Sequence, residues 1–169
     1  KDMVLPADIT LPEPALSTGI SNIFIAGIGG TGVSTLSGIL VMAAHLDGIA
    51  GQAVNQTGLS QKNGGVTSQV RLSRDQPLNQ RMVRLPTQAA SLLIGCDGVV
   101  AAHDLALTTL HKTTTTAILN TRLDPVGVAG VGIGSVVSDD LVLARLAAVM
   151  DARNIHQIDA SDLASRLFG

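Results

Sequence analysis

Glycines recur at the end of an apolar stretch in the first third of the chain. Residues 21–46 read SNIFIAGIGGTGVSTLSGILVMAAHL, in which Gly27, Gly29 and Gly32 follow the spacing G-x-G-x-x-G. The pattern predicts a strand, a glycine turn and a helix, an arrangement in which backbone N–H groups at the helix N-terminus can hold a phosphate. We therefore select these candidate cofactor-binding residues: Gly27, Gly29, Gly30, Thr31 and Gly32.

The same glycines allow a purely structural interpretation. Glycine lacks a Cβ atom, so Gly32 can let the helix pack close to the strand without any ligand. A dinucleotide site also needs an acid about 20 residues further on, at the end of the second strand, to hold the ribose. That strand is expected to end at Asn55 and Gln56, which are not acidic. We therefore expect no NAD, FAD or ATP site, and the lack of a Gly-Lys-Ser/Thr sequence excludes a P-loop.

A second polar, glycine-rich stretch, QTGLSQKNGG at 56–65, is expected to form a loop. Its one charge, Lys62, is suited to a carboxylate or phosphate, so the loop can contact an anionic ligand or a neighbouring domain, or be a solvated turn. Arg71 on the following strand is expected to form an ion pair rather than to bind an anion. The candidate loop and strand residues are Ser60, Gln61, Lys62, Asn63, Gly64, Gly65 and Arg71.

No residue is assigned a catalytic or metal-binding role. Cys96 and Asp97 follow an expected strand at the carboxyl edge of the sheet, where open α/β folds bind ligands. No histidine is placed beside Cys96 by the sequence, which argues against a nucleophile. The four histidines lie on separate expected elements without metal-ligand spacing.

The elements that must position these residues alternate between strand and helix. Residues 1–19 hold half of the prolines and are expected to be an extended linker, followed by one domain over 20–169. The helix at 32–46 is apolar almost all round and is expected to be buried on most sides. Strands separated by helices predict a Rossmann-like three-layer α/β sandwich with a largely parallel sheet. Strands are expected at 22–26, 50–55, 66–73, 81–84, 91–95, 114–119 and 155–158, and helices at 32–46, 98–110, from Ser138 or Asp139 to 152, and from Asp159 or Ser161 onward.

Composition limits the classes of partner. Only 14% of residues are charged, the net charge is −2, and Trp and Tyr are absent, so nucleic-acid binding is not expected. The longest apolar run, 36–46, has about half the length that spans a bilayer. A single cysteine excludes an intrachain disulfide and an all-cysteine iron–sulfur site, and it is typical of a reducing compartment. With no visible signal peptide, we expect a cytoplasmic location and no membrane contact.

The motifs together resemble a known family. GIGGTGVSTLSGILVMAAHLDG (27–48) and TGLSQKNGGVTSQVRLS (57–73) are similar to the gamma-type domain of 2-oxoacid:ferredoxin oxidoreductases. GLSQK at 58–62 is most similar to the single-chain indolepyruvate ferredoxin oxidoreductases, although Asn63 stands where that branch carries Gly. The family pattern falls on these residues: Gly29, Gly30, Gly32, Gly64, Gly65, Val70, Arg71, Leu72 and Ser73.

The resemblance implies an accessory domain of an enzyme that oxidatively decarboxylates an aryl pyruvate to an acyl-CoA. That enzyme would use thiamine diphosphate, magnesium, iron–sulfur clusters and coenzyme A, and would pass electrons to ferredoxin. The expected partners of this domain are the thiamine-binding and iron–sulfur domains of the same enzyme, and the chain itself, expected to be a truncated fragment, would be inactive. Two alternatives stay open: a nucleotide-binding domain of a dehydrogenase or adenylating enzyme, and a purely structural interdomain module.

Overall fold

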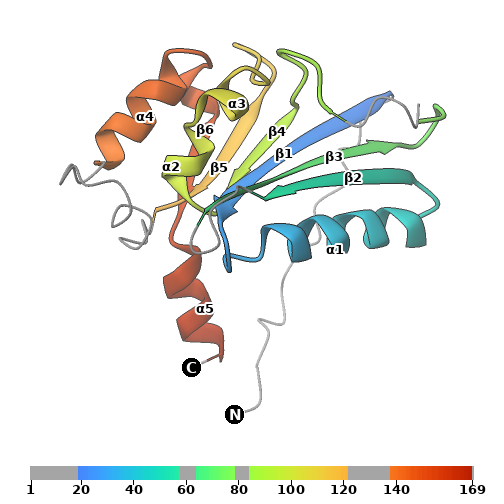
Figure 1. Cartoon of the computed structure of the whole chain (residues 1–169), viewed down its shortest axis with the longest axis horizontal. Helices are drawn as coiled ribbons and strands as arrows, with labels where there is room; N and C mark the ends of the chain where they lie inside the picture. Colours follow the sequence, from blue (N-terminus) through green and yellow to red (C-terminus); the bar gives the residue numbers. More distant parts are fainter. Residues whose placement is uncertain (1–18, 58–63, 79–83, 122–137, 169) are drawn as a thin grey trace.

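The fold is a six-stranded sheet with helices on both faces (Figure 1). The computed structural model describes residues 19–57, 64–78, 84–121 and 138–168. The expected linker (except Gly19), most of the expected strand at 81–84, and residues 58–63 of the second loop lie outside the described residues. The strands run in the order β2-β3-β1-β4-β5-β6, and they are β1 (Ile20–Ile28), β2 (Ala50–Thr57), β3 (Gly65–Ser73), β4 (Leu92–Gly95), β5 (Thr116–Asn120) and β6 (Ile155–Ile158).

The sheet is largely parallel, as the sequence predicts, with one reversed strand. The strands β1, β4, β5 and β6 pair in parallel. The strand β3 lies between β1 and β2 and is antiparallel to both, with Arg71 opposite Asn22 on one side and Gln52 on the other. The strands β2 and β3 form a hairpin, because the seven residues between Thr57 and Gly65 are fewer than the dozen or so that a parallel crossover needs.

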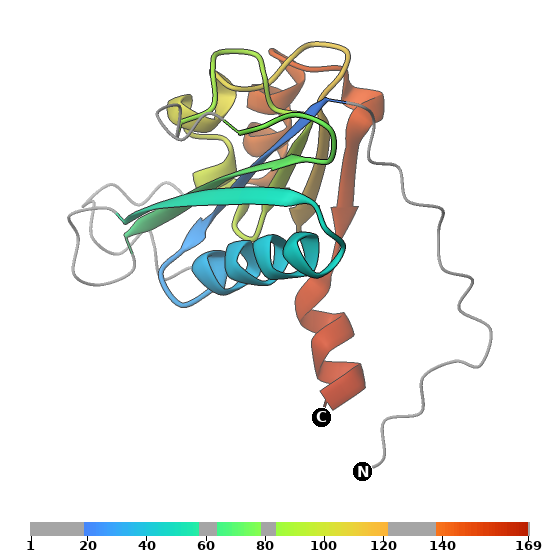
Figure 2. The same cartoon turned by 90° about the vertical axis from the view of Figure 1, so that its right-hand side faces the viewer.

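Two apolar cores lie on opposite faces of this sheet. Successive side chains of a strand point to opposite faces, so β1 contributes Ile23 and Ile25 to one core and Phe24 and Ala26 to the other. The first core packs against α1 (Val33–Leu46), which runs along β1, β2 and β3 (Figure 2). The second core includes side chains of α2 (Gly98–Ala101), α3 (Asp104–Leu107) and α4 (Asp139–Ala147). These layers confirm the predicted three-layer α/β sandwich.

The single helix predicted over 98–110 is wrong. The chain forms α2 and α3 instead, separated at His103, whose backbone is extended (φ −75°, ψ 151°). Asp104 then stands in the first turn of α3, where a carboxylate interacts favourably with the helix dipole. The break turns the chain between the two short helices, so that they cover the sheet as two separate pieces.

The helix α1 is less enclosed than its composition predicts. Its inner face packs on the sheet, but Ile39 and Met42 are each 59% exposed and Leu46 is 78% exposed. The expectation that α1 is buried on most sides is therefore wrong for the described part of the chain. The apolar residues of its outer side face solvent because none of the described elements packs on α1 from that side.

The C-terminal helices begin where the sequence predicts. The Ser138 side chain accepts a hydrogen bond from the backbone N–H of Leu141 and caps α4, which ends at Ala147 rather than near 152. A 3-10 turn (Ala152–Asn154) then leads into β6. The Asp159 carboxylate accepts from the backbone N–H of Asp162 at 2.8 Å and opens α5 (Ala160–Phe168), which projects beyond the sheet in both views.

Residues 29–32 form a turn, called the glycine turn below, that packs closely against Gly27 inside β1. A Cβ atom added there would fall into the space of the Thr31 Oγ1, Val33 Cγ2 and Cys96 Cβ atoms. Gly32 has open space around it, so our expectation that Gly32 permits close helix packing is wrong. What Gly32 supplies is a left-handed backbone (φ +82°), which residues with a Cβ atom adopt only at a cost of about 1–2 kcal/mol.

We predict that Gly27→Ala destabilises the domain by about 1–3 kcal/mol, because the added methyl group overpacks the junction of β1, the turn and β4. The matched control is Gly38→Ala in α1, where a Cβ meets nothing within 4 Å. That change is expected to stabilise the domain by about 0.5–1 kcal/mol. Urea unfolding followed by circular dichroism measures both, and equal midpoints for the two variants would contradict the packing argument.

Candidate functional site

The candidate site lies at the carboxyl edge of the parallel strands. The strand β1 ends at Ile28, β4 at Gly95 and β5 at Asn120, and the turn at 29–32 follows β1 directly. Open α/β sheets bind ligands at this edge, because loops and helix N-termini converge there. Two cavities flank the turn, one toward β5 and α5 and the other toward the start of α1.

The cavity toward β5 and α5 has a volume of about 470 Å³. The Asn120 amide links two segments that line the cavity: Nδ2 donates to the Cys96 carbonyl at 3.4 Å, and Oδ1 accepts from the Ala160 backbone N–H at 3.1 Å. On the opposite side the Thr31 hydroxyl donates to the Ile28 carbonyl at 2.7 Å. These bonds fix the walls of the cavity. Its lining residues are Gly30, Thr31, Cys96, Asp97, Asn120, Ala160, Ser161 and Ala164.

Cys96 and Asp97 reach this cavity, but their contacts are structural. The Asp97 carboxylate, 2% exposed, accepts from the Val100 backbone N–H at 3.0 Å and caps α2. Burial, and secondarily the adjacent Asp97 carboxylate, raise the pKa of the Cys96 thiol. A raised pKa keeps the thiol protonated at neutral pH, whereas a nucleophilic cysteine needs the thiolate.

The second cavity, of about 370 Å³, lies at the N-terminus of α1. The first hydrogen bond of the helix runs from the Leu36 N–H to the Gly32 carbonyl at 2.8 Å, so the amides of residues 33–35 precede it. The N-cap residue, Gly32, has no side chain to cap this end, and the first turn carries no acid. The arrangement can accept an anion. Gly29, Gly30 and Gly32 are among its lining residues, together with Ser34, Thr35, Thr57 and Val66.

The two glycine-rich stretches singled out in the sequence meet beside this cavity. The Gly29 N–H donates to the Gly64 carbonyl at 3.1 Å, and Ile28 of β1 pairs with Gly65 of β3. The candidate residues Ser60, Gln61, Lys62 and Asn63 lie outside the described residues. The structure thus brings together the glycine turn and the Gly64–Gly65 end of the second loop.

Arg71 is not part of this group. It lies near the opposite end of β3 from Gly65, a separation of about 20 Å at the rise of an extended strand. It is 6% exposed, and its Nε donates to the Asn22 Oδ1 at 3.4 Å across the β1–β3 pair. The expected ion pair of Arg71 stays a prediction.

Two features of β2 differ from those of a dinucleotide site, in which the second strand carries the ribose-binding acid. The Asn55 side chain at the end of β2 accepts from the Ser37 hydroxyl at 3.1 Å and therefore faces α1. In addition, β3 separates β2 from β1, so the end of β2 lies two strand spacings, about 10 Å, from β1. Both features argue against a dinucleotide site of the usual geometry, in which the acid stands on the strand next to β1.

Sequence reasoning missed Asn120 and Ser161 as site residues. The available signal was position: each follows or ends a strand on the edge where Cys96 had already been placed. Within the described residues, no group of three or more His, Cys, Asp or Glu side chains could hold a metal ion. In the same part of the chain, every helix is too short or too polar to cross a membrane.

Comparison with known proteins identifies the family. Residues 22–169 match the pyruvate ferredoxin/flavodoxin oxidoreductase family. The chain belongs to this family. A comparison with curated proteins finds no match.

Two solved structures have a similar fold. The pyruvate oxidoreductase subunit PORC of Thermotoga maritima is 16% identical, with a TM-score of 0.58 over 87% of this chain and 66% of that one. The 2-oxoglutarate:ferredoxin oxidoreductase of Magnetococcus marinus is 14% identical, with a TM-score of 0.56 over 89% of this chain and 22% of that one. At these identities the likeness concerns the fold, and the chain spans less than two thirds of either relative.

We predict that Cys96 reacts with a disulfide reagent at pH 8 more slowly than a free thiol does, because its raised pKa lowers the thiolate fraction. Asp97→Asn removes the nearby charge, keeps a good helix cap, and is expected to lower the Cys96 pKa and speed the reaction. Asp104→Asn is the control, since that carboxylate is exposed and pairs with Arg145. Equal rates for the wild-type chain and both variants would contradict the contribution of the Asp97 carboxylate to the raised pKa.

Proposed function

We propose that the chain is the gamma-type domain of a 2-oxoacid:ferredoxin oxidoreductase and acts as an accessory part of that enzyme. The observation that carries the proposal is the family match over residues 22–169, which includes the glycine turn and the β2–β3 hairpin. Two similar folds come from enzymes named for pyruvate and for 2-oxoglutarate. The proposed partners are the thiamine-binding and iron–sulfur parts of the same enzyme, and ferredoxin through them.

The proposed substrate is an aryl pyruvate, with indolepyruvate as the leading candidate. The support is the stretch GLSQK at 58–62, which resembles the indolepyruvate branch. The stretch joins β2 and β3 at the edge where the glycine turn lies, because Thr57 ends β2 and Gly65 begins β3. A loop anchored in this way on two rigid strands is a suitable place for substrate or partner contacts.

The iron–sulfur clusters of such an enzyme do not fit the donor groups of this chain. Cys96 is its one cysteine, and a four-iron cluster needs four thiolate ligands. The described residues also bring no three acidic or metal-ligating side chains together for a magnesium ion. We therefore place thiamine diphosphate, magnesium and the clusters in the other parts of the enzyme and derive no chemical step from residues of this chain.

What this chain contributes is positioning. The amides at the start of α1 border a cavity that Gly29, Gly30 and Gly32 of the glycine turn line, and this concave helix N-terminus suits a negatively charged group. Gly27 and Thr31 support the turn from behind without lining that cavity. Coenzyme A and the oxoacid both carry such groups. Because Gly29 is hydrogen-bonded to Gly64, an anion held at the turn lies next to the second loop.

Substrate turnover by the enzyme that contains this chain tests the proposal. We expect reduction of ferredoxin or a viologen dye with indolepyruvate and coenzyme A, at a kcat/KM at least ten times that with pyruvate or 2-oxoglutarate. The isolated chain is expected to be colourless and inactive in the same assay. Preference for a small oxoacid would refute the aryl substrate but keep the family function, whereas no oxoacid turnover would refute both.

A double substitution tests the proposed role of the second loop. In the complete enzyme, Gln61→Ala with Lys62→Ala is expected to raise the KM for oxoacid or coenzyme A several-fold without lowering the melting temperature. The reason is that Lys62 is the one charge of the loop and suits a carboxylate or phosphate. Lys112→Ala, at an exposed site after α3, is the control for loss of a positive charge. Wild-type kinetic constants for the double variant would reduce the loop to a solvated connection.

A further inference from the structure

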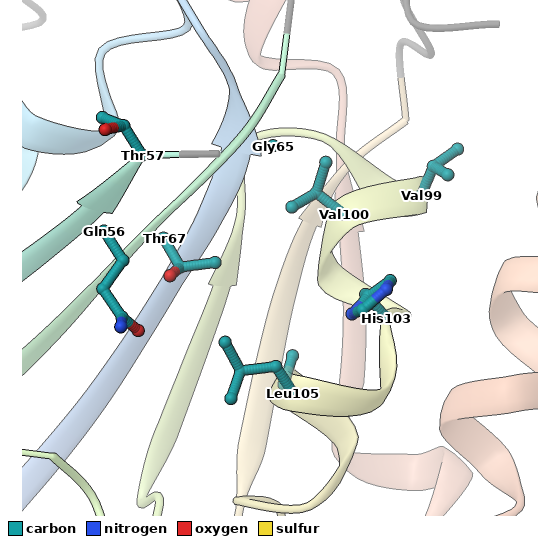
Figure 3. A pocket seen from close by; sticks show the side chains of 9 residues that line it. Gln56, Thr57, Gly65, Thr67, Val99, Val100, His103 and Leu105 are labelled. Carbon is teal, nitrogen blue, oxygen red and sulfur yellow. The ribbon is translucent and has the colours of Figure 1, made fainter. Parts of the chain in front are cut away.

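A third cavity, of about 420 Å³, lies between the β2–β3 hairpin and the α2–α3 segment (Figure 3). It is on the face of the sheet opposite α1, because Asn55 faces α1 and the neighbouring Gln56 therefore faces away from it. The cavity is separate from the two that flank the glycine turn, although Thr57 lines both this one and the one at the start of α1. Its lining residues are Gln56, Thr57, Gly65, Thr67, Val99, Val100, His103, Leu105 and Ala106.

Two features of the chain create this space. The break at His103 sets α3 apart from α2, so that Val100 and Leu105 point from the two helices toward Gln56 and Thr67 on the strands (Figure 3). Gly65 brings β3 close to α2, since a Cβ there would lie 3.3 Å from the Val100 Cγ1. The backbone of the α2–α3 segment on one side and of β3 on the other therefore shapes the cavity. Its volume is within the range of small-molecule pockets.

The lining selects an uncharged ligand. Among the described lining residues there is no Asp, Glu, Lys or Arg, and His103 is the one titratable side chain. One wall is formed by the apolar side chains Val99, Val100, Leu105 and Ala106. Bringing a phosphate or carboxylate into such surroundings costs free energy without a compensating charge. A flat apolar ring, by contrast, gains from burial against this wall.

One polar atom of the lining lacks a partner. The Gln56 Oε1 is shut off from solvent and accepts no hydrogen bond from the described residues. An acceptor that is buried without a donor is costly, and the great majority of such atoms in proteins are paired. The terminal torsion of a glutamine side chain is soft, so a ligand that enters beside Gln56 can turn the amide and supply the missing N–H.

We infer that this cavity is a binding site for an uncharged, planar aromatic ring that carries one N–H donor, of which indole is the simplest example. The ring lies against Val100 and Leu105, and its N–H donates to the Gln56 Oε1. The inference goes beyond the proposed function, because it is drawn from the lining of this cavity and requires no partner domain or cofactor.

The chain contains no Trp and no Tyr, so the fluorescence of added indole can be followed without protein background. Titration of the chain with indole is expected to give a saturable spectral shift. The compound 1-methylindole, which lacks the donor, is expected to bind at least fivefold more weakly. Gln56→Met keeps the bulk of the side chain and removes the acceptor, and in that variant the two ligands are expected to bind equally.

Gln52→Met is the matched control, since Gln52 lies on the same face of β2 and does not line the cavity. It is expected to keep the wild-type preference for indole, with circular dichroism confirming that both variants fold. Absence of saturable indole binding at millimolar concentration would overturn the inference, and so would an unchanged preference in Gln56→Met. Neither result bears on oxoacid turnover by the complete enzyme, so failure of this inference is distinguishable from failure of the proposed function.

Discussion

The close approach of the glycine turn to the end of β1 is the contact on which the rest of the structure depends. The space beside Gly27 is filled by Thr31, Val33 and Cys96, which belong to the turn, to α1 and to the segment after β4. Because β1 lies inside the sheet between β3 and β4, this one contact fixes the direction of α1 and the position of the carboxyl edge. Both cavities beside the turn exist because the chain can pass so close to the strand.

Much of this arrangement could be predicted from residue patterns. The apolar run before Gly27 and the long apolar run after Gly32 predict β1 and α1 closely. A short apolar run bounded by glycines indicates a buried strand, whereas a run of more than ten residues indicates a helix. Ser138 and Asp159 mark helix starts because their side chains cap backbone N–H groups locally. The carboxyl-edge position of Cys96 and Asp97 follows from the parallel strands and also proved correct.

Features decided by tertiary contacts could not be predicted in the same way. The G-x-G-x-x-G pattern does not say which glycine needs room, and the structure assigns the close contact to Gly27 and the positive φ to Gly32. Helical propensity over 98–110 gave no sign of the extended His103. The outer face of α1 depends on what covers it, which is not a local property of the residues Ile39, Met42 and Leu46.

The reversed strand β3 also has a consequence for the order of folding. Its pairing with β2 joins segments that are adjacent in the chain, and its pairing with β1 closes a longer loop around α1. Residues 20–73 therefore hold a strand, a helix and a hairpin that pair with one another inside the segment, and β1 pairs in addition with β4. The parallel pairs formed by β4, β5 and β6 each require a crossover, so each closes a longer loop than the β2–β3 pair and carries a larger loop-closure entropy than that pair. The β2–β3 hairpin, which closes the shortest loop of the sheet, is thus suited to form first and to offer the edge of β3 on which β1 assembles.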